Sequence, residues 1–235
     1  MSNGWGKFPA LFACPSPKNG QSRDMNSKPL KPVPDFSFEM AALKRGAKII
    51  AGVDEVGRGP LAGPVTAAAV ILDPNDIPEG LNDSKLLTAK RREALEAVIF
   101  EKAQVSIAHA SVEEIDDINI LRASHLAMVR AIAGLNVVPD HVLIDGNMIP
   151  RDLTLSSEAI IKGDSKSVSI SAASIVAKIC RDRLMVDLAQ QHPGYGWETN
   201  AGYGSKSHMS ALLKLGVTPH HRRSFKPVHN ILYQG

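Results

Sequence analysis

Short apolar segments alternate with longer helical patterns from about residue 47 onward, and this alternation restricts the fold more than any other feature of the chain. Buried strands are predicted where apolar residues run together, at 49–53, 65–72, 105–110, 141–144 and 160–161. Helices are predicted at 89–103, 111–132, 167–190 and 207–215. Strands that alternate with helices pack as a central sheet with helices on its faces. We therefore expect an α/β domain with a small helical part at its C-terminal end.

Polar residues and glycines at the predicted helix ends support these bounds. Thr88 can serve as the N-cap of the first of these helices. Ser111 followed by Glu114 forms a capping box, in which each residue satisfies a free backbone N–H of the other. Gly134 then ends the helix that this box begins.

The first 45 residues differ in composition from the rest. Prolines recur there among Ser, Asn, Gly and Lys, and no helical or strand period is sustained, so we expect disorder over most of residues 1–45. Up to Lys48 there are eight basic and three acidic residues, a net charge of +5, whereas the remainder holds 19 basic and 21 acidic residues, a net charge of −2. One domain is expected over 46–235, with its helical C-terminal segment starting near residue 190. Deleting residues 1–40 should then leave this domain folded and active.

Composition excludes several classes of protein. No apolar run approaches the ~20 residues of a membrane span, and two cysteines, Cys14 and Cys180, argue against a disulfide framework. No His or Cys cluster has the spacing of a zinc site. Because the body carries no excess of positive charge, it could bind a polyanion only through local patches and metal ions. We expect a cytoplasmic monomer with no membrane contact.

Two adjacent carboxylates, Asp54 and Glu55, follow the apolar run 49–53 directly, and the glycine-rich turn Gly57–Gly59 comes next. Neighbouring strand residues point to opposite faces of a sheet, so both acids serve one site only if the strand stops or twists there. Glycines permit such a bend and the close approach of another backbone. Carboxylates beside a turn that carries Arg58 suit a divalent metal together with a phosphodiester. A charged surface turn is the alternative for an isolated acid pair.

Two further acids stand in comparable places. Asp145 follows the apolar run 141–144 and precedes a glycine, a pattern that is also typical of a β-turn. Asp164 precedes the long helix predicted from residue 167, where an aspartate also serves as a helix cap. Because ends of neighbouring strands gather at one rim of an α/β sheet, we expect Asp54 and Asp145 to meet there.

In order and context these segments resemble the motifs of the type 2 ribonucleases H, the ribonuclease HII family. The resemblance spans about residues 49–215 and includes DEVGRGP from Asp54, the DG of Asp145, KGD ending at Asp164, DSK at 83–85 and GYGSKSH at 202–208. It implies a mixed ribonuclease H-like sheet flanked by helices. It also implies an endonuclease that cuts the RNA strand of RNA–DNA hybrids and cuts 5′ to single ribonucleotides embedded in duplex DNA, leaving 3′-hydroxyl and 5′-phosphate ends.

The resemblance also assigns roles to residues. It implies that a carboxylate quartet holds Mg²⁺ or Mn²⁺ and that a second group contacts the substrate. The quartet consists of Asp54, Glu55, Asp145 and Asp164, and the substrate-binding group of Gly57, Arg58, Gly59, Lys85 and Tyr203. Four clustered acids would repel one another unless cations neutralised them, and hard divalent cations prefer oxygen ligands. A glycine turn can approach the 2′-hydroxyl that separates RNA from DNA.

Several basic residues and Tyr203 have simpler interpretations. Tyr203 could be a core tyrosine in a tight turn, although its flanking glycines favour an exposed loop position. Lys178 and Arg181 could face nucleic acid, but solvation on a helix surface is the simpler interpretation. The basic cluster at 220–226 is more typical of a solvated tail than of a binding patch.

Three alternatives remain at this point. Ribonuclease HIII shares the fold and the metal chemistry, but a DES-type acid motif with GKG would be expected there in place of DEVGRG. A non-catalytic nucleic-acid-binding module would have lost at least one of the four acids. A phosphate-binding α/β protein would be expected to carry a Walker-type glycine loop, which the sequence lacks.

Overall fold

The computed structural model describes residues 33–233, which contain a five-stranded sheet in the order β3-β2-β1-β4-β5. The strands are β1 (Ile50–Val56), β2 (Val65–Leu72), β3 (Ala103–Ala110), β4 (His141–Asp145) and β5 (Ser157–Ile160). β1, β2 and β3 pair antiparallel, whereas β1, β4 and β5 pair parallel. The sheet is therefore mixed, as the family resemblance implied.

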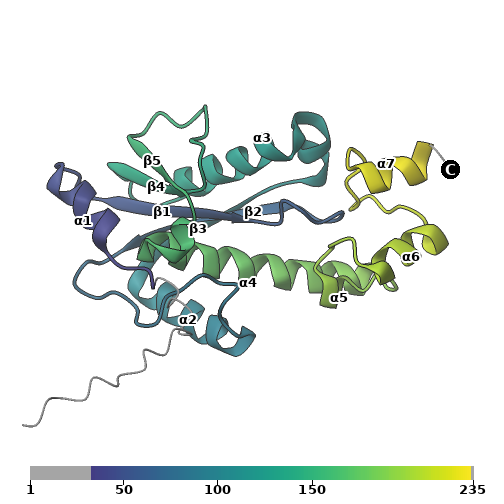
Figure 1. Cartoon of the computed structure of the whole chain (residues 1–235), viewed down its shortest axis with the longest axis horizontal. Helices are drawn as coiled ribbons and strands as arrows, with labels where there is room; N and C mark the ends of the chain where they lie inside the picture. The colour runs from purple at the N-terminus through teal and green to yellow at the C-terminus, as the bar shows by residue number, and fades with distance from the viewer. Residues whose placement is uncertain (1–32, 234–235) are drawn as a thin grey trace, which may run out of the picture. The chain divides into compact units, whose positions relative to one another are not determined.

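Helices cover both faces of this sheet (Figure 1). They are α1 (Ser37–Lys44), α2 (Ala89–Lys102), α3 (Val112–Ala133), α4 (Val168–Gln191), α5 (Trp197–Asn200), α6 (Lys206–Leu215) and α7 (Lys226–Tyr233), with a 3₁₀ turn at Gly163–Ser165. α3 packs on one face of β1, β2 and β3, and α4 packs with α2 on the other. None of the helices within residues 33–233 is long and apolar enough to cross a membrane.

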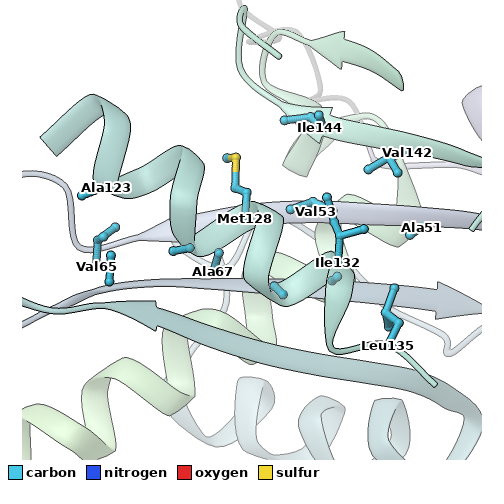
Figure 2. Packing of buried hydrophobic residues seen from close by; sticks show 14 of the residues in the cluster. Ala51, Val53, Val65, Ala67, Ala123, Met128, Ile132, Leu135, Val142 and Ile144 are labelled. Carbon is cyan, nitrogen blue, oxygen red and sulfur yellow. The ribbon is translucent and has the colours of Figure 1, made fainter. Parts of the chain in front are cut away.

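The core beneath α3 joins the helix to three strands. Met128 and Ile132 of α3 belong to one buried cluster with Val53 of β1 and Ala67 of β2 (Figure 2). These side chains are at most 5% exposed, and alanines dominate the strand side of the contact. Small residues on the strands let α3 approach the sheet closely. This close packing supports β1 and β4 from the side opposite α4.

On the opposite face the first turn of α4 crosses β1 at Gly52. A Cβ built at Gly52 would lie 2.2 Å from the carbonyl carbon of Ser169, so no larger residue fits beneath the helix. Ser174, one helical turn further on, is buried and its Oγ lies 2.8 Å from Ser84 Oγ. α4 thus lies directly over the end of β1 and fixes the loop that carries Lys85.

Most predicted elements are confirmed. The strand at 65–72 has the predicted bounds, and those of α2 and α4 differ from prediction by one residue at one or both ends. Thr88 caps α2, and Ser111 and Glu114 form both hydrogen bonds of the predicted capping box. The small strand expected at 160–161 is β5, which begins and ends earlier. β1 does not end at residue 53 as expected but continues through both acids to Val56.

The helix α1 corrects the prediction for residues 1–45. Residues 1–32 lie outside the described part, but α1 begins at Ser37, inside the segment expected to be disordered. Its Glu39 is 1% exposed and accepts hydrogen bonds from Ser167 Oγ (2.5 Å), Ser169 N (3.0 Å) and Ser169 Oγ (2.6 Å). A buried acid has no compositional signature in a proline-rich stretch, so the sequence pattern missed it. The deletion of residues 1–40, expected to be harmless, would remove this contact.

The C-terminal helices form a small separate core. α7 was not predicted, and α5 is a short helix inside the loop expected at 194–204. Both pack with α6 and the last turns of α4 around Trp197, Leu212 and Val228, as far as the loop at Leu61. In Figure 1 these helices lie together at the end of the sheet where β1 meets β2. This arrangement confirms the helical C-terminal part and places it beside the glycine-rich turn.

Candidate active site

Asp54 and Asp145 lie at the ends of adjacent parallel strands. Val53 of β1 is in register with Ile144 of β4, so the two aspartates occupy the next, equivalent positions. Equivalent positions on neighbouring strands project to the same face, about 4.8 Å apart along the hydrogen-bonding direction. Both carboxylates therefore meet on the face that α4 covers, as predicted from the strand ends.

Asp164 joins this pair from the turn before α4. Lys162 takes a left-handed conformation (φ 57°, ψ 46°), which reverses the chain between β5 and the 3₁₀ turn. The N–H of Gly163 then donates to Asp145 Oδ1 at 2.6 Å, so the turn is fixed to the end of β4. Asp164 is 6% exposed, and its Oδ2 lies 3.8 Å from Lys85 Nζ. Three acids and one lysine are thereby gathered from four segments of the chain.

Glu55 projects to the other face because β1 remains a strand there. Its Oε1 accepts from Arg58 Nη1 at 3.4 Å. Its Oε2 is buried and has no hydrogen-bond partner within residues 33–233. The side chain is 11% exposed, whereas that of Arg58 is 50% exposed. Glu55 therefore lies at the edge of the acidic group and links it to the glycine-rich turn.

The acids perturb one another's ionisation. Burial raises the pKa of Asp54 well above its ordinary value, and the charges of Glu55, Asp145 and Asp164 raise it further. Burial raises the pKa of Glu55 to about 7 against the opposing effect of Arg58, with Asp145 adding to the rise. Burial also raises the pKa of Asp164, and Asp145 contributes. The four carboxylates thus form one electrostatic group that favours a bound cation.

The residues present fit a divalent cation in their chemistry. All four donors are carboxylates, the ligands that hard cations prefer, and the unpaired oxygen of Glu55 is a buried acceptor without a donor in the described residues. Within residues 33–233, no three His, Cys, Asp or Glu side chains close around a single metal-sized point. Two of the four acids instead bind protein groups, since Asp145 accepts from the N–H of Gly163 and Glu55 accepts from Arg58.

The Gly57–Gly59 turn lies beside this group and under Tyr203. Gly57 has a φ of +94°, and a Cβ there would lie 2.1 Å from Arg181 Nε, so the position requires glycine. A Cβ on Gly59 would lie 3.3 Å from Tyr203 Cε1, which places the aromatic ring over the turn. Tyr203 is 48% exposed. The exposed loop position is therefore confirmed for Tyr203, and the core alternative is wrong.

Two arginines support the turn from inside the protein. Arg181 is 1% exposed and donates to the carbonyls of Pro64 (3.0 Å), Ala201 (3.0 Å) and Ala62 (3.1 Å). Arg222 is 0% exposed and donates to the carbonyls of Gly63 (3.0 Å), Arg58 (2.9 Å) and Gly57 (2.6 Å). The surface interpretation of Arg181 is wrong, and so is the solvated-tail interpretation for Arg222.

These contacts give the turn its orientation. The Arg222 guanidinium binds the carbonyls of Gly57 and Arg58 from the protein interior, while the Arg58 side chain is half exposed. Burial lowers the pKa of Arg181 to about 10 and that of Arg222 to about 9, so both remain charged at neutral pH. Sequence reasoning missed these roles because arginine at a helix or tail position is usually solvated. Ser174 also acts at this site, since its hydroxyl contacts Ser84 Oγ and its hydrogen bond lowers the pKa of Asp54.

The sheet is mixed, and carboxylates gather from two parallel strand ends and a helix start, beside an exposed turn that carries Arg58. This combination defines a class of protein, the metal-dependent nucleases with the ribonuclease H fold. Comparisons with known proteins support this class. The ribonuclease HII family model matches residues 51–228. A ribonuclease HII of Ruegeria pomeroyi is 69% identical over 215 residues, covering 92% of this chain and 89% of that protein.

Solved structures agree on the fold. The ribonuclease H2 of Pyrococcus horikoshii OT3 matches with a TM-score of 0.67 at 27% identity, covering 80% of this chain and 98% of that one. Bst-RNase HIII, crystallised in complex with Mn²⁺, matches with a TM-score of 0.65 at 20% identity, covering 82% of this chain and 72% of that one. At that identity the second match shows the fold alone.

The chain belongs to the ribonuclease HII family. It is a divalent-metal-dependent endonuclease that acts on the RNA strand of RNA–DNA hybrids. The DEVGRG motif had favoured this family over ribonuclease HIII, and the family match confirms that choice. The two non-enzymatic alternatives are thereby excluded.

Proposed function

We propose that this ribonuclease cuts on the 5′ side of a single ribonucleotide embedded in duplex DNA and leaves 3′-hydroxyl and 5′-phosphate ends. The observation that carries the proposal is the position of the half-exposed Tyr203 ring over Gly59. A backbone turn beside an aromatic ring can bind two consecutive nucleotides. The ribose would bind at the Gly57–Gly59 turn, and the sugar of the next nucleotide would pack against the Tyr203 ring.

We further propose that Asp54, Glu55, Asp145 and Asp164 hold Mg²⁺ or Mn²⁺. The raised pKa values of Asp54, Glu55 and Asp164 and the unpaired Glu55 oxygen support this assignment. When bound, such ions activate a water and stabilise a leaving oxygen in phosphodiester hydrolysis. The same chemistry suits either ion.

The surrounding residues position the substrate. Backbone N–H groups of the Gly57–Gly59 turn would bind the 2′-hydroxyl, whose donor and acceptor character distinguishes ribose from deoxyribose. Arg58 and Lys85, both exposed cations at the rim of the acidic group, pair with the phosphates that flank the ribonucleotide. The Tyr203 ring stacks on the sugar that follows and leaves too little room for a second 2′-hydroxyl.

The setting of the enzyme belongs to the same proposal. The chain's low cysteine usage fits a reducing cytoplasm, and we expect it to act there as a monomer on nucleic acid. Residues 1–32, which carry much of the excess positive charge, would then serve substrate affinity at low salt rather than the fold.

The test uses three duplexes: one with a single ribonucleotide, one RNA–DNA hybrid and one of DNA alone. We expect cleavage 5′ to the single ribonucleotide, cleavage of the hybrid and none of the DNA, with products that a polymerase extends from their 3′ ends. Chelation should abolish cleavage, and either Mg²⁺ or Mn²⁺ should restore it. Cleavage 3′ to the ribonucleotide would refute the proposed register.

Two substitutions separate the carboxylates from the recognition slot. Asp145→Asn should remove most activity on both cleavable substrates. Tyr203→Ala should lower cleavage of the single-ribonucleotide duplex by about ten- to a hundredfold, the value of one base-type stack. Tyr203→Phe should cost less because the ring remains. Wild-type turnover by Asp145→Asn, or by Tyr203→Ala on the single-ribonucleotide duplex, would remove that residue from the proposal.

A further inference from the structure

A chain of buried hydrogen bonds ends at the backbone of Tyr203. Trp197, His208 and His221 are 1%, 0% and 0% exposed and come from α5, α6 and the loop before α7. His221 Nε2 lies 3.1 Å from His208 Nε2, and Trp197 Nε1 lies 3.0 Å from the same atom. His208 Nδ1 lies 2.9 Å from the carbonyl oxygen of Tyr203.

The partners determine where each proton sits. The N–H of Thr218 donates to His221 Nδ1 at 3.0 Å, so neutral His221 carries its proton on Nε2 and donates to His208. The indole N–H of Trp197 can only donate, which makes His208 Nε2 an acceptor. His208 must then carry its proton on Nδ1, from which it donates to Tyr203. The chain therefore runs in one direction, from Thr218 through both rings to the Tyr203 carbonyl.

We propose that His208 is a positioning residue for substrate recognition, because its Nδ1–H holds the backbone of Tyr203 and thereby the ring over the Gly57–Gly59 turn. This inference rests on the proposed role of Tyr203. His208 itself is fully buried and cannot touch substrate. It acts through the one carbonyl that it shares with the N–H of Ser205, which donates at 2.8 Å.

The backbone around Tyr203 needs such support. Ala201 and Gly202 both have left-handed conformations, with φ of +48° and +82°. The ring is half exposed, so packing around it does not by itself hold it in place. A recognition group contributes most when its supporting contacts hold it in the bound geometry beforehand. The turn's own hydrogen bonds, Tyr203 N to Asn200 O (2.9 Å) and Gly202 N to Asn200 Oδ1 (2.8 Å), fix one side of it, and His208 fixes the other.

A matched pair of substitutions isolates the contact. His208→Asn keeps an amide N–H near the position of Nδ1 and loses the acceptor for Trp197 and His221. His208→Gln places an amide oxygen near Nε2 and loses the donor to Tyr203. Both remove the ring and both leave a small cavity. We expect His208→Gln to lower kcat/KM on the single-ribonucleotide duplex by about tenfold, the value of one hydrogen bond. His208→Asn should stay within about threefold of wild type.

The double variant His208→Gln with Tyr203→Ala tests whether His208 acts through Tyr203. If His208 acts through Tyr203, then His208→Gln should cost nothing further once the ring is absent. An equal loss in both backgrounds, or wild-type activity of His208→Gln beside an impaired Tyr203→Ala, would overturn the inference. Trp197 fluorescence and thermal unfolding report whether each variant keeps the small C-terminal core.

Hydrogen exchange tests the inference independently of activity. The Ser205 amide, which shares the Tyr203 carbonyl with His208, should exchange faster in His208→Gln than in His208→Asn. If Tyr203→Ala proves fully active, the proposed role of Tyr203 fails, while the exchange data still decide whether His208 holds the turn. Equal exchange in the two variants would refute the positioning role.

Discussion

At the scale of the residue, the buried carboxylate of Glu55 lowers stability in the metal-free protein while serving the proposed function. Its Oε2 is buried without a partner in the described residues, and burial beside Asp145 raises its pKa to about 7. Ionised Glu55 therefore destabilises the metal-free protein at pH 8. Glu55→Gln should raise the free energy of unfolding there by about 1 kcal/mol, measured by urea denaturation in chelator, and should abolish cleavage.

Metal addition provides the control for this prediction. If Glu55 is a metal ligand as proposed, Mg²⁺ or Mn²⁺ should stabilise the wild type by mass action and stabilise Glu55→Gln less, because that ligand has lost its charge. The wild type would then match or exceed the variant at saturating metal. A Glu55→Gln protein that is less stable than wild type in chelator would show that the carboxylate is held by favourable contacts instead.

Arg222 is a buried cation, and all three hydrogen bonds that its side chain donates go to backbone carbonyls. Arg222→Met would leave the carbonyls of Gly57, Arg58 and Gly63 without their donors. Unsatisfied buried acceptors cost about 1–3 kcal/mol each, so we expect a loss of about 2–5 kcal/mol in the free energy of unfolding. Arg223→Ala, at the exposed neighbouring position, should change it by less than about 0.5 kcal/mol. Equal effects of the two variants would contradict this account.

At the scale of the element, α1 and α4 depend on each other. Glu39 accepts the hydrogen bonds of Ser167 and Ser169 at the start of α4, and the backbone of Asp35 pairs with that of Lys166 and Val168. This contact lies next to the turn that presents Asp164. The start of α4 is therefore held from a segment that precedes the sheet in sequence.

Two truncations measure this dependence. Removing residues 1–32 should leave unfolding and hybrid cleavage unchanged. Removing residues 1–40 should lower the free energy of unfolding by about 2–4 kcal/mol, because the buried hydrogen bonds that Glu39 accepts from Ser167 and Ser169 are lost. Glu39→Ala in the full chain should account for most of that loss. Thermal unfolding of the three proteins, measured together, checks the prediction. Two truncations of equal stability would mean that α1 does not support α4.

At the scale of the whole molecule, buried neutral histidines make stability depend on pH. Burial, with the charge of His208 adding to it, lowers the pKa of His221 to about 3, against an ordinary value of about 6.5 in the unfolded chain. Between these values the unfolded chain binds more protons, so the free energy of unfolding falls as pH falls from about 6.5 toward 3. The stabilisation from neutral His221 is fully present above that window.

Urea denaturation at pH 7.5 and pH 5 tests this sign. Relative to His221→Asn, which has no ring to protonate, the wild type should lose about 1–2 kcal/mol between the two pH values. Protonation of Asp54 and Glu55 acts in the opposite direction and is common to both proteins, so the difference between them isolates His221. His229→Asn, on the exposed face of α7, serves as the control and should follow the wild type. Equal changes of stability with pH in the wild type and His221→Asn would contradict the neutral, buried state of His221.

The alternation of elements, the capping residues and the meeting of Asp54 and Asp145 at adjacent strand ends were predictable from the sequence, because they depend on local periodicity and on motifs read in order. Residues close in sequence determine the bounds of β2, the helix caps at Thr88 and Ser111, and the position of Asp145 at a strand end. Tertiary structure alone decided the rest. Glu39, Arg181, His221 and Arg222 look like solvated residues in sequence, yet each is buried because its partners are backbone or side-chain groups far along the chain, as with Arg222 and Gly57. A polar residue is buried when distant partners replace water, and only the folded chain brings such partners together.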